Sequence, residues 1–246
     1  MRISLANQLT MALLDDVLQA SGGLELWRQL RRFTVHLSIG GALCTRMCAP
    51  LVKHVVVEGG VHEQALEITG FTAPDRRALY RPDWVALERS DGALLKERHA
   101  TAAEFRRDLK AGAWDELQLA FYCGSLIRSH LNLPFVLADA DVVINEPTPA
   151  NGHDRLRQLQ VRFPERLATH STESTFYFDD RSLLRRQDYC APHHDEMRIA
   201  QIFSGHQCYS GILIATLCRL LMRDDDDSII ARPSLIDVEI FDASFD

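Results

Sequence analysis

The sequence lacks long hydrophobic runs, an excess of positive charge, and short motifs for metal, phosphate or nucleophile chemistry. Near the N-terminus, the apolar run of residues 11–14 is followed at once by Asp15 and Asp16, so we expect neither a secretory signal nor a membrane-spanning helix. A net charge of −7 gives no general attraction for phosphate backbones, which excludes nucleic acid as an expected partner. These absences predict a soluble, cytoplasmic protein.

The cysteines contain neither a CxxC pair nor the dense, even spacing of a secreted disulfide scaffold. They are Cys44, Cys48, Cys123, Cys190, Cys208 and Cys218. We expect free thiols, which agrees with a cytoplasmic setting. Cys123 and Cys218 stand among apolar neighbours, a position more typical of inert core thiols than of nucleophiles.

The length and the apolar content fit a single domain over residues 1–246, since 46% hydrophobic residues supply a sizeable core. Residues 4–32 are predicted to be helical. Leu5, Leu9, Leu13 and Val17 recur every four residues, which makes one apolar stripe on a helix. Gly22 and Gly23 then break the helix before a short second one that carries Trp27.

Residues 33–99 change to a hydrophobic period of two, which predicts strands. The expected strands are 34–40, 51–58, 61–70, 77–81, 84–90 and 93–99. Their connections are too short for parallel crossovers, so the sheet is expected to be antiparallel.

Residues 101–135 are predicted to form a helical insertion. Thr101 with Glu104 fits a capping box, and the segment 114–132 is apolar on most sides, which indicates a buried helix that ends before Pro134. Strands are expected again within residues 141–241, at 141–145, 156–163, 174–178, 183–189, 198–203, 211–222 and 233–241. The predicted class is α+β: a curled antiparallel sheet, or incomplete β-barrel, with an N-terminal helix and an inserted helical plug.

Four segments carry a resemblance to a known fold. They are Gly22-Gly23 with Trp27, Trp114-Asp115, residues 175–179 and residues 211–216. In these features the chain resembles the LolA/LolB-like (lipoprotein carrier-like) fold, nearest to its uncharacterised bacterial members. The resemblance implies an incomplete barrel around a lipid-sized cavity that helices plug.

Aromatic and polar side chains near the insertion are the candidates for binding a ligand in that cavity. They are Trp114, Asp115, Phe121, Tyr122, His130, Phe135, Tyr177 and Tyr189. The leading hypothesis is a cytoplasmic binding protein for a lipid-like or other apolar small molecule. The competing interpretation is that these aromatics simply fill the interior.

Two other functions stay open. One is an enzyme of the cyclase or isomerase type, with His130, His54 or His170 as its acid or base. The other is a non-catalytic subunit that pairs with a partner through a sheet edge. Residues 193–196, two histidines followed by two acids, resemble metal ligands, and the acidic run 224–227 resembles a calcium loop; both lack a complete ligand pattern, so we expect no metal and no cofactor.

Overall fold

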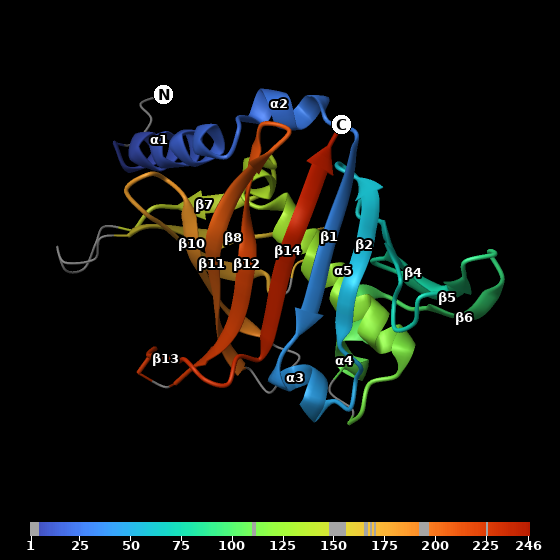
Figure 1. The fold of residues 1–246 in the computed structure, drawn as a ribbon. Helices are drawn as coiled ribbons and strands as arrows, with labels where there is room; N and C mark the ends of the chain where they lie inside the picture. Colours follow the sequence, from blue (N-terminus) through green and yellow to red (C-terminus); the bar gives the residue numbers. More distant parts are fainter. Residues whose placement is uncertain are drawn as a thin grey trace.

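The computed structural model describes residues 5–109, 112–147, 156–164, 167, 169, 171–191, 197–224 and 226–246 (Figure 1). Its helices are α1 (Leu5–Ala20), α2 (Leu24–Gln29), α3 (Ala42–Arg46), α4 (Ala102–Asp108), α5 (Glu116–Asn132) and the 3-10 helix η1 (Phe135–Ala138). Its strands are β1 (Arg32–Gly40), β2 (Val52–Gly60), β3 (Leu66–Thr69), β4 (Arg76–Arg81), β5 (Trp84–Arg89), β6 (Leu94–His99), β7 (Val143–Asn145), β8 (Arg157–Arg162), β9 (Glu173–Phe178), β10 (Leu184–Ala191), β11 (Met197–Tyr209), β12 (Ile212–Arg223), β13 (Ile229–Ile230) and β14 (Ile236–Phe245).

A single antiparallel sheet of 14 strands contains all of these strands. Its order is β6-β5-β4-β3-β2-β1-β14-β12-β11-β10-β9-β8-β7, with β13 paired to β12. The last strand, β14, lies between β1 and β12 and so joins the two halves of the chain into one sheet (Figure 1). Because β6 and β7 are edge strands, the sheet is curled but not closed into a barrel, as the sequence predicted.

The break between α1 and α2 fixes the N-terminal helices to the sheet. Gly22 has a φ of 115°, and a Cβ atom there would lie 2.3 Å from the carbonyl oxygen of Gly211. The carbonyl of Ser21 accepts a hydrogen bond of 3.0 Å from the backbone N–H of Leu213. Only glycine therefore allows this close approach to the start of β12.

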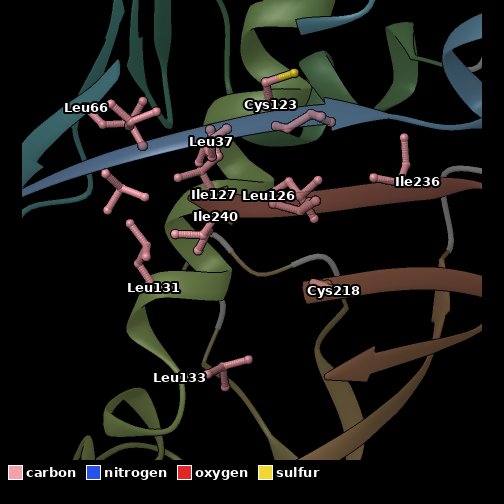
Figure 2. Packing of buried hydrophobic residues seen from close by; sticks show 14 of the residues in the cluster. Leu37, Leu66, Cys123, Leu126, Ile127, Leu131, Leu133, Cys218, Ile236 and Ile240 are labelled. Carbon is pink, nitrogen blue, oxygen red and sulfur yellow. The ribbon is translucent and has the colours of Figure 1, made fainter. Parts of the chain in front are cut away.

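Helix α5 is the buried helix that its apolar sequence predicted. It begins with a capping box in which Asp115 and Gln118 exchange side-chain and backbone hydrogen bonds of 2.8 Å. It passes behind β14, β1 and β2 in the view of Figure 1, and its Leu126, Ile127 and Leu131 belong to one hydrophobic cluster with strand residues (Figure 2). No described helix has both the length and the apolar character that crossing a membrane requires.

Several elements differ from those predicted, and β14 ends four residues later than expected. Residues 42–46 form α3, which the alternating pattern did not indicate. The predicted strand 61–70 contains only β3, because β2 continues through Gly59 and Gly60 and the turn follows them. Strand β11 extends to Tyr209 rather than residue 203, because it pairs with β12 along a long hairpin.

Candidate ligand-binding site

An apolar cavity of about 50 Å³ lies between α5 and strands β10 to β12. We call it the tyrosine cavity; its walls include Phe121, Tyr122, Ser125, Tyr189, Ala191 and Met197. Sequence reasoning therefore named three residues that the fold brings together here: Phe121, Tyr122 and Tyr189. A buried water needs about 10–15 Å³ of such volume, so the space holds a few waters rather than a whole lipid. Side chains fill most of the predicted interior.

Helix α4 and the start of α5 hold the wall of this cavity in place. Phe105 stacks on Phe121 with ring centroids 4.4 Å apart. The ring of Trp114 lies 4.8 Å from that of Tyr122, and its indole N–H donates a hydrogen bond of 2.9 Å to the carbonyl of Leu109. Trp114 thus packs against the ring of Tyr122 and does not line the cavity itself.

The polar groups at the tyrosine cavity are two neutral hydroxyls, a serine and one guanidinium. Burial raises the pKa of Tyr122 and that of Tyr189 well above the usual range, so both phenols are neutral at physiological pH. Burial also lowers the pKa of Arg106, whose Nη1 donates a hydrogen bond of 2.9 Å to the carbonyl of Thr169. An apolar cavity with a few such groups binds apolar molecules and orients their polar end.

Two other residues that were predicted to bind the ligand, Asp115 and Phe135, make contacts that hold the fold together. Asp115 caps α5, and its Oδ2 pairs with Arg98 at 3.1 Å. Phe135 stacks almost parallel on Trp27, with centroids 4.3 Å apart and an interplanar angle of 6°. Phe135 therefore joins η1 to α2, away from the tyrosine cavity.

Tyr177 lies on the opposite face of the sheet from the tyrosine cavity. Its hydroxyl donates a hydrogen bond of 3.1 Å to Asp188, a buried carboxylate that also pairs with Arg186 at 2.6 Å and with Arg223 at 3.3 Å. Tyr177, Asp188 and Arg223 border an open groove. Successive strand residues point to opposite faces. Asp188 borders this groove but not the tyrosine cavity, whereas its neighbour Tyr189 borders both.

The candidate histidines occupy different places. His130 is buried on α5, and the carbonyl of Ala215 accepts a hydrogen bond of 2.8 Å from its Nε2. Burial lowers the pKa of His130 to about 4, so its ring is neutral near pH 7. His54 is exposed and stacks on Phe241 at 5.1 Å. His170 lies outside the described residues.

The described residues contain no group of three or more histidine, cysteine and acidic side chains arranged to hold a metal ion. Residues 193–196 lie outside the described part of the chain, as does residue 225 of the acidic run. In that run, Asp224 accepts backbone N–H groups of its own turn, and Asp227 pairs with Arg223 at 3.0 Å. All six cysteines are unpaired, and burial raises the pKa of Cys123 and of Cys218 above that of a free thiol.

Sequence reasoning missed the most unusual polar group near α5. Arg128 is buried, with 6% of its surface exposed, in a helix whose other Asp, Glu, Lys or Arg side chain is Glu116 of the first turn. The available signal was a charged residue within a segment predicted to be buried on most sides.

Two solved structures of bacterial proteins are similar to this fold. A DUF1329 family protein from Desulfovibrio piger aligns with a TM-score of 0.53 and 10% identity, over 96% of this chain and 93% of that chain. A LolA superfamily protein from Nitrosomonas europaea aligns with a TM-score of 0.51 and 5% identity, over 96% of this chain and 92% of that chain. No protein-family model matches the sequence, and the search of curated proteins found no match. The structural similarity confirms the predicted resemblance: the chain has a LolA-like fold.

Proposed function

We propose that the protein binds an apolar small molecule in the tyrosine cavity. The observation that carries this proposal is the chemistry of the cavity wall, which combines apolar side chains with the neutral hydroxyls of Tyr122 and Tyr189 beside Arg106. Contact with the walls supplies affinity, and the hydroxyls orient a polar end. The LolA-like fold supports the proposal, because a curled sheet plugged by a helix leaves its unfilled space along that helix.

The size of the cavity restricts the ligand. At about 50 Å³, it has space for only a few non-hydrogen atoms, and a longer chain or a ring needs the walls to move apart. Met197 is the wall residue best suited to such movement, since methionine has three rotatable bonds and adapts to irregular gaps. Removing about 150 Å² of ligand surface from water contributes about 4 kcal/mol, before the cost of association.

We also propose a cytoplasmic location, on the basis of the cysteine pattern. Cell fractionation checks this directly. The alternative of acid–base catalysis by His130, His54 or His170 stays a prediction. His130 borders a separate small cavity with His206, so we expect His130→Gln to leave ligand binding unchanged.

Native mass spectrometry of the gently purified protein tests the proposal. We expect a fraction of the protein to carry additional mass, and organic extraction to release one apolar compound or a narrow set of compounds. The extracted protein should then rise in melting temperature with compounds from a panel of medium-chain acids, alcohols and isoprenoids. Empty protein together with no shift across the panel would contradict the proposal.

A further inference from the structure

Arg128 is a buried cation without a counter-ion among the described residues. Its Nη2 donates to the carbonyl of Val61, and its guanidinium lies 5.7 Å from the ring centroid of Phe33. Its Nε and Nη1 atoms are buried and have no hydrogen-bond partner in the described part of the chain. The nearby acid that influences it, Glu63, is exposed and lies beyond ion-pair distance. A buried charge without a counter-ion is costly, so an anion that bound beside Arg128 would stabilise it.

A second cavity of about 50 Å³ lies beside Arg128. We call it the arginine cavity; it is lined by Arg128 and Ser129 of α5 and by apolar side chains that include Leu133, Val136, Phe163 and Phe176. The hydroxyl of Ser129 is also buried without a hydrogen-bond partner among the described residues. Arg128 and Ser129 thus place buried donors beside apolar walls, and a small turn of these side chains brings the donors to the cavity.

We infer that the arginine cavity binds the carboxylate of an apolar acid, with Arg128 as its anchor. Nη1 is a donor of a charged, planar guanidinium, and its charge-assisted hydrogen bond to a carboxylate oxygen is stronger than one to a neutral hydroxyl. Ser129 supplies a further hydrogen bond. Burial lowers the pKa of Arg128 only to about 10, so the guanidinium stays charged at pH 7 and a bound anion neutralises it.

The position of the arginine cavity relative to the tyrosine cavity indicates the direction in which the apolar tail of the acid would extend. Ser125 lines the tyrosine cavity and Ser129 lines the arginine cavity, and four residues along a helix span about 6 Å on one face. Between the two cavities, Arg106 of the first is hydrogen-bonded to Thr169 of the second. A carboxylate at Arg128 therefore directs an apolar tail along α5 toward the tyrosine cavity. The inference rests on the proposed function, because it names the head group of the same ligand.

Calorimetric titration of the full-length protein with sodium octanoate and with 1-octanol, at pH 7.5, tests the inference. The two probes share an eight-carbon chain and differ in the charged head. We expect octanoate to bind at least about tenfold more tightly than octanol, the ratio that a charge-assisted hydrogen bond provides. Arg128→Met should remove this preference by weakening octanoate binding about tenfold while octanol binding changes less than about twofold.

The matched control is Arg107→Met, which removes an exposed arginine of α4 and should keep the preference. Arg128→Lys should keep part of it, because a charged donor stays but the planar guanidinium that positions it is lost. If Arg128→Met fails to fold, two measurements still test the inference. One is the preference of the wild type, and the other is Ser129→Ala, which should weaken the binding of octanoate more than that of octanol. Equal binding of both probes by the wild type, or a preference that survives Arg128→Met, overturns the carboxylate site and leaves apolar binding intact. Absence of binding by either probe contradicts the proposed function as well.

Discussion

The two sides of α5 meet the same curled sheet in different ways. On one side the helix lies close against β3, β4, β5 and β6, and Gly124 brings its backbone onto Tyr80 without a side chain between them. On the other side, toward β8 to β12, no described strand approaches α5 to the same extent. Both cavities border that second side, and so does His130, whose Nδ1 has no hydrogen-bond partner among the described residues. Arg128 lies at the boundary between the two sides, because its Nη2 donates to the carbonyl of Val61.

This difference assigns two roles to one helix: one side anchors α5 to the sheet, and the other side borders the proposed binding cavities. We call the side that packs against β3 to β6 the filled side. It fixes the depth and rotation of α5, since a close-packed contact tolerates little change in volume. The opposite side can then keep space and unpaired donors that would be destabilising in an ordinary core. We therefore expect substitutions on the first side to change stability, and substitutions in the cavity walls on the second side to change binding.

The largest expected effect concerns acid stability and His130. Its pKa is about 4 in the folded protein, against 6.5 for an ordinary histidine. The unfolded chain takes up the proton below pH 6.5 and the folded chain does not, so the free energy of unfolding falls by about 3 kcal/mol as the pH falls from 6.5 to 4. His130→Gln should remove most of this loss.

Urea denaturation at several pH values measures that effect. His206, whose pKa burial also lowers, adds a smaller loss in the same direction and stays in both proteins. His36→Gln, at an exposed position of β1, is the control and should keep the wild-type slope. An unchanged slope in His130→Gln would show that the buried ring is not the group that titrates.

The next largest effect concerns the contact between Gly124 and Tyr80 on the filled side. A Cβ atom on Gly124 would lie 2.3 Å from Cγ of Tyr80, so Gly124→Ala forces the helix and β4 apart. We expect the free energy of unfolding to fall by about 2 kcal/mol, despite alanine's better helix propensity. Gly40→Ala, where the nearest atom would be a Leu51 methyl at 3.4 Å, should change it by less than about 1 kcal/mol. Equal losses in the two variants would contradict the close contact.

The smallest effect concerns Ser125, which belongs to both sides. Its hydroxyl is hydrogen-bonded to Tyr80, and the residue also lines the tyrosine cavity. Ser125→Ala should lower the free energy of unfolding by about 1 kcal/mol. Binding of 1-octanol should change by less than about twofold, because the apolar walls stay. A loss of binding without a loss of stability would place Ser125 in the binding site rather than at the anchor.

Much of the fold could be predicted because the burial pattern of the chain follows simple periods. The alternating residues of β1 and the apolar circumference of α5 each indicate one kind of element. His54 is a residue whose position the simple alternation does not predict. Strict alternation places His54 on the same face as the buried Val52. The pairing of β1 with β2 shifts between Leu37 and Ile39, and His54 adopts a φ of 51°, so the residue is exposed instead.

The candidate site was predictable only in part. Phe121 and Tyr122 could be placed together because they are neighbours on one helix, and Tyr189 joins them through strand pairings that no local pattern shows. Tyr177 looked equivalent to Tyr189, but the alternation of β9 and β10 puts it with Asp188 on the other face. Which side of α5 is filled depends on the contact between Gly124 and Tyr80, which are 44 positions apart.

Filling the tyrosine cavity tests the central claim most directly. Ala191 lines the cavity, and Ala191→Leu adds three carbons to a wall that has space for them. Calorimetric titration with 1-octanol should show affinity at least about tenfold weaker than wild type, with an unchanged or higher melting temperature. Ala103→Leu, on the exposed face of α4, is the control and should bind as the wild type does. Wild-type affinity in Ala191→Leu would contradict binding at this side of α5.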